Sequence, residues 1–559
     1  MYRKLFQLRQ PKSHTYRTEI LLDRLWVIGL LVAALTLYLT NLGGLPLRDW
    51  DEGIVAQVAR EIYNAPPEAL RWLYPTLDGQ PYINKPPLVH LLIASTYSIS
   101  GMINEWTTRL PGAILTAISV PLLYSIGREI FPRRLWAIFS ALVYLTLLPV
   151  VRHGRLAMLD GAILCFFLLT IWCLLRCRRD LRYCLGVGIG LGLIALTKGI
   201  LAFLLGAIAL AFIAWDTPRL LTSIYFWTGI IIGSLPATFW YAAQLLHHNP
   251  AYVETFINQG ILNQSLKRIW DQVDDHKGPP WYYILEILKY NWPWLLFLPL
   301  SLNLAWENRN LSWAKLILVW SGLYLFVISI MNTKLPWYVL PIYPALALII
   351  GAQLAEIWNW PSNKPLPRSW FAVLSILIIG SWAACIYFAR FTSQIELDLV
   401  LTLTAIALTM TIALVLMFKR DLQFIIILFW GSYLSLFLLM NSDNWVWELN
   451  EQYPVKPVAQ MIQQSPVPLG QKIYTSYPQF RPSLNFYSER QIIPATDDTL
   501  QKIWQKELSP YFLLRSSFPK KLNLEPVEII DRVKTNTPEP EGSWVLITKD
   551  KYYYTTEKT

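Results

Sequence analysis

Three carboxylates near the start of the chain are the residues with the clearest capacity for acid–base chemistry. They are Asp49, Asp51 and Glu52, and they follow the first long hydrophobic segment. Behind them, apolar residues recur at helical spacing through 54–62, and Pro66-Pro67 would end a helix. We therefore expect a helix that begins at the carboxylates and is amphipathic enough to lie along a membrane surface.

These carboxylates have two explanations. A carboxylate can accept the proton of an attacking hydroxyl or amine, which would make this stretch catalytic. Asp49 and Glu52 are also spaced like a capping box, and acidic residues are favoured at a helix N-terminus. The local sequence leaves both explanations open, so the surrounding elements must decide between them.

The composition defines the class of protein. Of 559 residues, 54% are hydrophobic, 14% aromatic and only 15% charged, and the mean hydropathy is +0.36. These values are typical of a polytopic α-helical membrane protein. The formal charge of +11 does not indicate a nucleic-acid partner, because the basic residues cluster between hydrophobic segments and no nucleic-acid-binding motif is present.

Runs of ~20 apolar residues predict about thirteen membrane spans. The predicted spans are 24–42, 109–131, 134–151, 158–176, 181–197, 199–215, 222–243, 289–306, 312–331, 336–357, 369–390, 395–417 and 422–440. Arginine and lysine residues place the N-terminus and the connections at 128–134, 176–182 and 419–420 in the cytoplasm. Residues 86–100 open with two prolines and contain several polar residues. We interpret them as a second surface or re-entrant helix, which keeps every basic connection on the cytoplasmic side.

This topology collects the unusual polar segments outside the cytoplasm. They are 43–87, 152–160, 197–199, the long loop 244–288, 332–337 and the C-terminal region. Their convergence indicates an active site at the outer membrane surface.

After about residue 441 the chain changes character, and short β-like segments alternate with helical ones. Strands are expected at 472–476, 491–494, 511–515, 527–531 and 544–548, and helices at 458–464 and 499–508. We therefore expect a transmembrane catalytic domain over residues 1–441 and a small extracytoplasmic α/β domain over 442–559. None of the five cysteines follows residue 441, so no disulfide holds that domain together.

Further ionisable residues are expected at the outer ends of spans. Asp160 would lie just inside a helix, where an ionisable side chain is costly and indicates function. Arg152 and Arg155 could pair with it or extend to the interface. Lys198 lies against the positive-inside trend, which favours a bound anion such as a phosphate, and Lys85 lies on the rim of the first loop. A lysine that only reaches the interface is the alternative for each.

The loop 244–288 carries a second group of candidates. Asp274-Asp275-His276 invites a metal interpretation, but no second ligand pair follows at a fixed spacing. Lys267-Arg268 adds positive charge in the same loop. Later, Lys334 and Tyr338 open a span at the outer face, where aromatic residues also form an ordinary interface belt.

The ordered segments RDWDEGIVAQVAREI, LDGQPYINKPPL, RHGRLAMLDGAI, LTKG, HKGPPWYY and TKLPWYVLPIYPALAL resemble the GT-C superfamily of glycosyltransferases. The similarity covers residues 20–350. It is closest to the branch that holds protein O-mannosyltransferases and the aminoarabinose transferases that modify lipid A. The resemblance implies the GT-C fold, with about thirteen transmembrane helices plus juxtamembrane helices. It also implies inverting transfer of a sugar from a polyprenyl-phosphate donor to a lipid, glycan or protein acceptor on the extracytoplasmic side.

The resemblance implies roles for individual residues. Asp51 matches the first acidic position of the family, with Glu52 beside it, and Asp160 matches the second. Lys85 matches the lysine near the donor phosphate, where positive charge stabilises the departing phosphate. Further positive charge is expected there from Arg152, Arg155, Lys198 and Arg268.

Other roles concern the cavity and a metal. Tyr338 lies in the matching KLP-x-Y motif, and we expect the substrate cavity to be lined by Tyr82, His276, Lys334 and Tyr338. Asn84 stands where some relatives have a glutamate, so a divalent metal held by Asp51, Asp160 and His276 stays open.

A secondary transporter, such as a flippase of lipid-linked sugars, is the alternative from another class. Transporters commonly show repeated halves and broken midplane helices, whereas this sequence shows no repeat and gathers its charged residues at one face. We expect a multi-pass protein of the plasma (inner) membrane with a cytoplasmic N-terminus. The sugar and the acceptor stay open.

Overall fold

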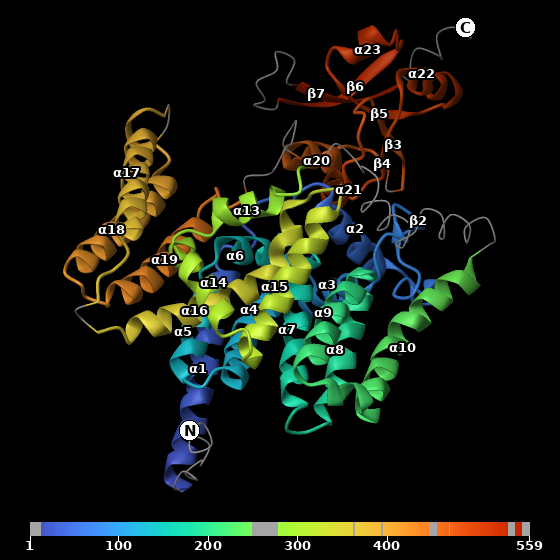
Figure 1. Ribbon diagram of the computed structural model, residues 1–559. Helices are drawn as coiled ribbons and strands as arrows, with labels where there is room; N and C mark the ends of the chain where they lie inside the picture. Colours follow the sequence, from blue (N-terminus) through green and yellow to red (C-terminus); the bar gives the residue numbers. More distant parts are fainter. Residues whose placement is uncertain are drawn as a thin grey trace, which may run out of the picture. The chain divides into compact units, whose positions relative to one another are not determined.

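A computed structural model describes residues 13–248, 278–361, 364–392, 395–446, 455–468, 470–534 and 543–549 (Figure 1). The chain divides into two compact units. The first, the helical unit, comprises Met1–Leu42, Ile83–Leu88 and Leu110–Trp445; the second, the mixed unit, comprises Gly43–Tyr82, Val89–Arg109 and Val446–Thr559. The expected domain boundary at 441–442 stays a prediction.

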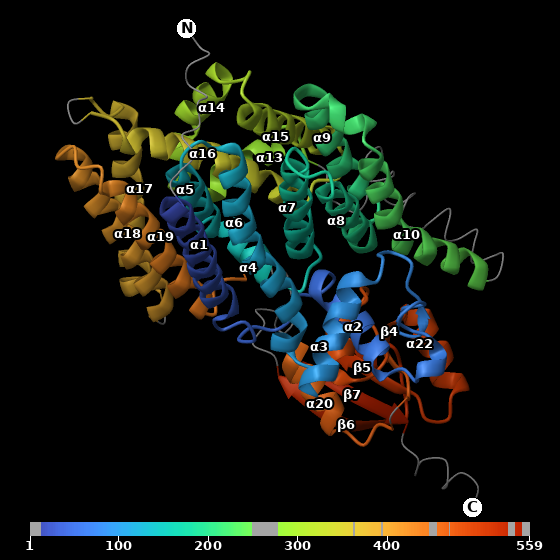
Figure 2. The same ribbon diagram turned by 90° about the horizontal axis from the view of Figure 1, so that it is seen from below.

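Helices of different lengths, most of them apolar, make up the helical unit (Figures 1 and 2). They are α1 (Ser13–Leu39), α4 (Glu105–Ile130), α5 (Arg134–Leu145), α6 (Leu148–Arg155), α7 (Asp160–Arg176), α8 (Tyr183–Lys198), α9 (Leu201–Asp216), α10 (Ile224–His247), α13 (Tyr282–Tyr290), α14 (Leu298–Glu307), α15 (Ser312–Ile330), α16 (Tyr343–Trp358), α17 (Arg368–Arg390), α18 (Leu397–Phe418) and α19 (Phe424–Asn441). Short 3₁₀ segments link them at η2 (Pro218–Thr222), η3 (Trp294–Phe297) and η4 (Pro336–Ile342).

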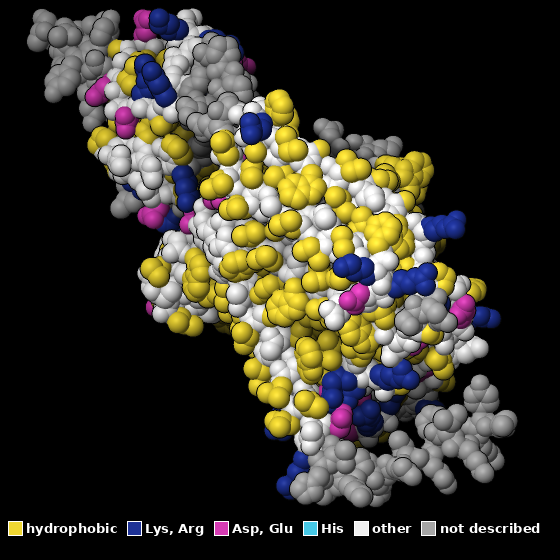
Figure 3. All heavy atoms as spheres, turned by 90° about the vertical axis from the view of Figure 1, so that its left-hand side faces the viewer, with side chains coloured by type: hydrophobic (Ala, Val, Ile, Leu, Met, Phe, Trp, Pro, Cys, Tyr) yellow, Lys and Arg dark blue, Asp and Glu magenta, His cyan; other side chains and the backbone are white. Residues whose placement is uncertain are grey.

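A helix lies at every predicted span. Within the described residues, eight helices are long and apolar enough to cross a membrane, or nine if one bent pair counts as a single span. The other predicted spans are shorter helices, such as α8 and α9 with 16 residues each. Hydrophobic side chains cover much of the face of the helical unit in Figure 3. The class expected from the sequence, a polytopic helical membrane protein, is confirmed.

The span predicted at 134–151 is broken. α5 and α6 meet at an angle of 58°, and Pro149 stands in the first turn of α6. A proline is accepted in the first turn of a helix but cannot continue one from before, because it lacks the backbone N–H. The break directs α6 away from the line of α5, and Arg152 and Arg155 are buried within the unit as a result.

Glycines bring α8 and α10 into direct backbone contact. A Cβ atom added to Gly188 would overlap the carbonyl of Gly229, and one added to Gly192 would overlap the carbonyl of Gly233. Each helix therefore presents two glycines four residues apart, which is the small-xxx-small pattern that lets membrane helices approach closely. This contact positions α8, whose last residue is Lys198.

A five-stranded sheet is the centre of the mixed unit. Its strands are β3 (Ile473–Thr475), β4 (Ile492–Pro494), β5 (Tyr511–Arg515), β6 (Val527–Lys534) and β7 (Ser543–Lys549), in the order β4-β3-β5-β7-β6. β3 runs parallel to β4 and β5, and β7 runs antiparallel to β5 and β6. All five strands coincide with those expected from the sequence, so the α/β prediction is confirmed.

Helices cover the sheet. α20 (Val455–Gln464) and α21 (Pro482–Ser488) contribute Val458, Ile462 and Leu484 to one hydrophobic core, and α22 (Asp497–Lys506) contributes Leu500 and Trp504 to another. A short α23 (Phe518–Lys521) follows β5.

The first loop of the chain belongs to the mixed unit. It contains α2 (Asp51–Asn64), η1 (Pro67–Ala69) and the two short strands β1 (Thr76–Leu77) and β2 (Gln80–Pro81), and α3 (Leu88–Ser100) follows. Gly53 of α2 lies against α21, where a Cβ atom would come within 2.7 Å of the Ser483 nitrogen. Ala56 and Phe486 extend this contact. Part of α2 is therefore covered by protein, whereas the sequence predicts a helix lying on a membrane surface.

The hairpin β1–β2 is tied to both α2 and α21 by carboxylates. Glu61 accepts hydrogen bonds from the Thr76 hydroxyl at 2.5 Å and the Asp78 backbone N–H at 2.6 Å. The Asp78 carboxylate accepts from Asn485 at 3.0 Å and more weakly from Gln57 at 3.4 Å. Burial raises the pKa of Asp78 to about 6, and the negative charge of Glu61 acts in the same direction.

The raised pKa of Asp78 predicts a pH-dependent hairpin. Its pKa in the folded state lies above the ordinary value of an aspartate, 3.8, so the folded state binds more protons and stability falls as the pH rises from about 4 to about 6. The loss is at most about 3 kcal/mol for a shift of about two pKa units. Hydrogen exchange of residues 76–82 should therefore quicken between pH 4 and pH 7 beyond the chemical rate. Asp78→Asn should remove this extra dependence, and an unchanged dependence in the variant would contradict the assignment.

The contact between α8 and α10 predicts that larger side chains separate these helices. Gly188→Val and Gly192→Val should each lower the stability of the detergent-purified protein by about 1–3 kcal/mol, measured by thermal unfolding. Gly322→Val on α15 is the matched control, because nothing lies within 4 Å of a Cβ atom there. Equal effects at all three positions would mean that the close approach has no special weight.

Candidate active site

Asp51 ends a tight turn in the mixed unit. Trp50, the residue before it, has φ 67° and ψ −60°, and the Asp51 backbone N–H donates to the Asp49 carbonyl at 2.8 Å. These are the features of the rare γ-turn with positive φ, which for a residue with a side chain costs about 1–3 kcal/mol. The Asp51 carboxylate lies 3.5 Å from the Arg48 guanidinium and is partly exposed. It is therefore a charged group held at the first turn of α2.

Asp49 is not used to cap α2. Its carboxylate accepts from Arg481 Nε at 2.5 Å, from the Ser483 backbone N–H at 3.2 Å and from the Ser483 hydroxyl. Both partners belong to the start of α21. The capping-box explanation of Asp49 is therefore replaced by a contact with the C-terminal α/β segment.

Glu52 is engaged by Arg109. Its Oε1 accepts from Arg109 Nε and its Oε2 from Arg109 Nη2, both at 2.8 Å, and Oε2 also accepts from the Arg48 backbone N–H at 3.0 Å. Both side chains of this pair are fully buried. A carboxylate with both oxygens bonded in this way is a weak proton acceptor, because hydrogen bonds and a cation favour its charged form. The geometry favours a structural role for Glu52.

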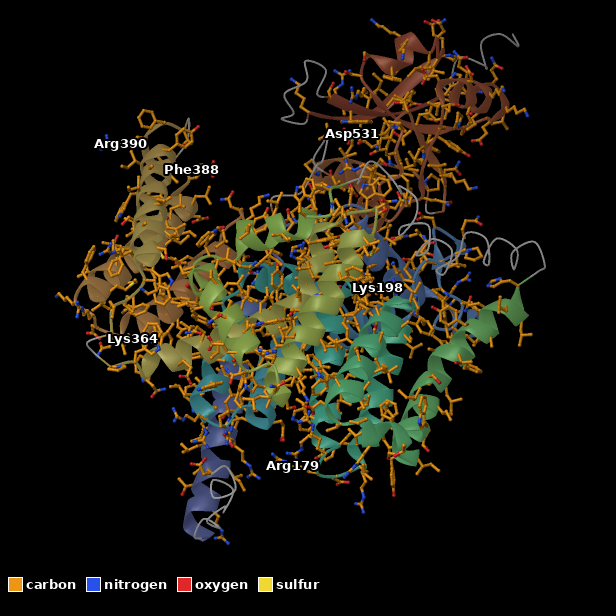
Figure 4. The ribbon with its side chains drawn as sticks, viewed as in Figure 1. Arg179, Lys198, Lys364, Phe388, Arg390 and Asp531 are labelled. Atoms are coloured by element: carbon orange, nitrogen blue, oxygen red, sulfur yellow. The ribbon has the colours of Figure 1, made fainter. Side chains whose placement is uncertain are left out.

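A second group of candidate residues meets in the helical unit. Asp160 is the first residue of α7 and Lys198 the last residue of α8, and the Lys198 ammonium donates to Asp160 Oδ1 at 2.8 Å. The Lys198 ammonium lies 5.4 Å from the centre of the Tyr338 ring. Tyr338 is in turn held through its carbonyl, which accepts from the Tyr324 hydroxyl at 2.8 Å. Lys198 and Arg179 lie toward opposite ends of the helices in Figure 4. The group of Asp160, Lys198 and Tyr338 therefore lies at the end of the helices away from Arg179.

Arg155 binds helix ends, and Arg152 binds the segment that follows α19. Arg155 donates to the Leu37 carbonyl at 2.8 Å and the Met440 carbonyl at 3.3 Å, at the last turns of α1 and α19. Arg152 donates to the Trp445 carbonyl at 3.1 Å, and the Arg155 guanidinium lies 4.6 Å from the centre of the Trp445 ring. The last carbonyls of a helix have no partner within the helix and carry negative partial charge. These contacts give both arginines a structural task.

The remaining candidates are spread over both units. Lys85 lies in the turn before α3 and is half-buried, and Tyr82 is buried with its ring centre 5.5 Å from that of His90. Lys334 caps α15, because its ammonium donates to the carbonyls of Ile328 and Ser329 at 2.9 and 2.7 Å. Arg268 and His276 lie outside the described residues.

The metal interpretation gains no support from Asp160, whose carboxylate is neutralised by Lys198 rather than left for a cation. Within the described residues, no three His, Cys, Asp or Glu side chains are grouped as a metal site requires. The proposed ligand His276 lies outside these residues. A metal at Asp51, Asp160 and His276 therefore stays a prediction, and we derive no reaction step from it.

Sequence reasoning missed the residues that hold the first loop. The sequence offered a hint for Arg109, because this basic residue lies near the N-terminal end of α4, whereas the basic connection at 128–134 lies at the other end. The sequence offered no hint for Arg481 and Ser483, because their partner Asp49 lies more than 430 positions earlier in the chain.

The structure defines a polytopic α-helical membrane protein with a small α/β domain, and its fold is similar to that of solved GT-C proteins. The sequence model of one family, described as dolichyl-phosphate-mannose-protein mannosyltransferase, matches residues 84–241. That range contains Lys85, Asp160 and Lys198 but not Asp51.

Curated relatives include two arabinosyl transferases of Pseudomonas fluorescens strains. One, an undecaprenyl phosphate-alpha-4-amino-4-deoxy-L-arabinose arabinosyl transferase 1, is 29% identical over 345 residues, which is 60% of this chain and 61% of the relative. The other, named arabinosyl transferase 2, is 26% identical over 343 residues, again 60% of this chain and 61% of the relative. The matched segment thus spans less than two thirds of the length of these relatives.

Two solved structures share the fold. ArnT from Cupriavidus metallidurans bound to undecaprenyl phosphate aligns with a TM-score of 0.73 and 16% identity, over 94% of this chain and 98% of that chain. The archaeal oligosaccharyltransferase AglB from Archaeoglobus fulgidus aligns with a TM-score of 0.51 and 12% identity, over 88% of this chain and 70% of that chain. The likeness to ArnT therefore extends across the helices and the C-terminal sheet.

The contacts of Arg155 predict a structural rather than a substrate-binding role. Arg155→Met should lower the free energy of unfolding by about 3 kcal/mol, because several buried carbonyls lose a charged donor. Thermal unfolding in detergent measures the loss. Arg179→Met is the matched control: Arg179 pairs with Glu129 but is 66% exposed, so its loss should cost at most about 1 kcal/mol. An Arg155→Met protein with unchanged stability and weaker donor binding would instead restore the phosphate-binding role expected from the sequence.

Proposed function

We propose that this protein is an inverting glycosyltransferase that moves a sugar from a polyprenyl-phosphate donor to a lipid, glycan or protein acceptor. The acceptor hydroxyl or amine attacks the anomeric carbon and loses its proton to a carboxylate. The bond from that carbon to the phosphate oxygen breaks, and its electron pair leaves with the polyprenyl phosphate. The configuration at the anomeric carbon is inverted.

One observation carries this proposal: the likeness to ArnT spans 94% of the chain, including the C-terminal sheet. That structure is described as bound to undecaprenyl phosphate, and the curated relatives are named for transfer from an undecaprenyl-phosphate sugar. These descriptions favour a C₅₅-type polyprenyl phosphate as the donor lipid and an amino sugar as the first sugar to test.

We assign proton acceptance to Asp51. It stands at a helix N-terminus with its side chain 26% exposed, whereas the side chain of Glu52 is buried against Arg109 and fully enclosed. The helix dipole and Arg48 keep the Asp51 carboxylate in its charged form. Its partial exposure lets the acceptor reach this carboxylate, which accepts a hydrogen bond from the acceptor and receives its proton in the transition state.

Asp160 and Lys198 are assigned to substrate positioning. Their ion pair joins the start of α7 to the end of α8, close to the Tyr338 ring. An arriving phosphate can compete with Asp160 for the Lys198 ammonium, which would leave the Asp160 carboxylate to accept a hydrogen bond from the acceptor or the sugar. Lys85 is assigned to the donor phosphate because it is the lysine of the segment LDGQPYINKPPL, which resembles the GT-C sequences.

The proposed setting is the plasma (inner) membrane, with the N-terminus in the cytoplasm and the reaction on the outer side. The basic connections at 128–134 and 176–182 support this orientation. The transporter alternative predicts transport without breakage of the sugar–phosphate bond, and the experiment below separates the two.

The assignment of Asp51 predicts that Asp51→Asn abolishes transfer. The change keeps the size of the side chain but removes the proton acceptor, so turnover of an undecaprenyl-phosphate amino sugar should fall about 10²-fold or more. Release of undecaprenyl phosphate by the purified protein measures the reaction. Asp498→Asn is the matched control, because that aspartate is exposed on α22.

Three other outcomes are informative. Unchanged turnover in Asp51→Asn would remove the base assignment but keep the glycosyltransferase. Donor binding without release of undecaprenyl phosphate in the unmodified protein would favour the flippase. Absence of donor binding would remove the polyprenyl-phosphate donor from the proposal.

A further inference from the structure

The turn before α2 is an unusual backbone element for its sequence. Trp50 has a positive φ of 67° and carries a large side chain that is 46% exposed. Glycine would adopt this conformation without a steric cost, but a residue with a Cβ atom does so only when its surroundings impose it. The turn therefore needs an external restraint at one of its ends.

The restraint lies on Asp49, the first residue of the turn. Its side chain is 11% exposed and that of Arg481 4%, and the contact to Arg481 Nε is a short, charge-assisted hydrogen bond of 2.5 Å. Ser483 adds a backbone and a hydroxyl donor to the same carboxylate. All three donors come from the first turn of α21 and the residue that precedes it.

The approach of α21 is itself built into the sequence of α2. Only a glycine at position 53 leaves room for the Ser483 backbone, and the Gly53 N–H donates to the Arg48 carbonyl at 2.8 Å. At the far end of α21, the Phe486 carbonyl accepts from Arg60, and Arg60 also pairs with Glu489 at 2.8 Å. The interface thus has two ends: one holds the turn, and the other only docks the helices.

We propose that Arg481 and Ser483 are positioning residues for the reaction, because they hold Asp49 and so keep the Asp49–Trp50–Asp51 turn in the conformation that aims the Asp51 carboxylate. The proposal rests on the proposed function for its consequence in turnover. Release of Asp49 would let Trp50 relax to negative φ. That change rotates the peptide group on which Asp51 is mounted and breaks the hydrogen bond from the Asp51 N–H to the Asp49 carbonyl.

The alternative is that these contacts merely dock the α/β segment on the first loop. Arg481 and Arg60 offer a matched pair to separate the two roles. Both are buried arginines at the interface of α2 and α21, but Arg481 contacts the turn and Arg60 contacts the far end of α21. Docking alone predicts equal effects of their loss, whereas positioning predicts that only Arg481 changes the turn.

The experiment compares Arg481→Met, Arg481→Lys and Arg60→Met in the full-length, detergent-purified protein. Hydrogen exchange of peptides that cover residues 47–56 reports on the turn, and exchange over 57–64 reports on docking. Turnover of an undecaprenyl-phosphate amino sugar gives kcat and KM. Arg481→Met should quicken exchange in 47–56 and lower kcat about ten- to a hundredfold with KM for the donor nearly unchanged, since misplacement of a reacting group acts on kcat. Arg481→Lys should retain part of kcat because it keeps the charge.

Trp50→Gly supplies the second variant. In the Arg481→Met background it should recover at least half of the loss in log kcat, because glycine takes a positive φ without strain and no longer needs the restraint. A role limited to docking predicts no such rescue. Trp50→Gly alone provides the reference for any contribution of the indole itself.

The outcomes are distinct. Equal losses in Arg481→Met and Arg60→Met without rescue by Trp50→Gly would overturn the proposal. Unchanged exchange in 47–56 after Arg481→Met would also overturn it. If the exchange responds as expected but the unmodified protein turns over no donor, the restraint on the turn stands while the proposed function fails.

Discussion

A charge removed from water must be paired, and this requirement governs both units of the structure. The pair of Glu52 and Arg109 is fully buried, with two parallel hydrogen bonds of 2.8 Å. An unpaired charge in such a place costs several kcal/mol, so each partner fixes the other. Because Glu52 also accepts from the Arg48 N–H, this pair holds the residue that precedes the Asp49–Trp50–Asp51 turn.

The same requirement explains the partners of two of the candidate cations. Arg155 and Lys334 both sit at helix ends, where they donate to carbonyls that have no partner within the helix. These side chains are buried, so an arginine or lysine is a structural residue as readily as a ligand of phosphate. Lys198 differs from them because its partner is a carboxylate, Asp160, which an arriving anion can displace.

The C-terminal α/β segment is more than an appended domain. Its helix α21 contacts α2 through Gly53 and holds Asp49 through Arg481 and Ser483. The candidate base is thus mounted on a helix whose first turn is restrained by residues from the other end of the chain. Catalytic groups gain most from such restraint when the surrounding elements hold a conformation that the local sequence would not adopt.

The sequence by itself determined the class of protein, the position of every predicted span and all five strands of the sheet, because hydrophobic runs and alternation are local properties of the chain. It also singled out Asp51, Asp160 and Lys198 by residue type and place. It did not determine which charges meet: it predicted Glu52 as a catalytic residue and Arg152 and Arg155 at the donor phosphate, without showing their partners in the fold. Only the tertiary structure assigned Arg109 to Glu52 and Arg481 to Asp49, because a pairing depends on the distance between atoms in space, and 432 positions of chain separate Asp49 from Arg481.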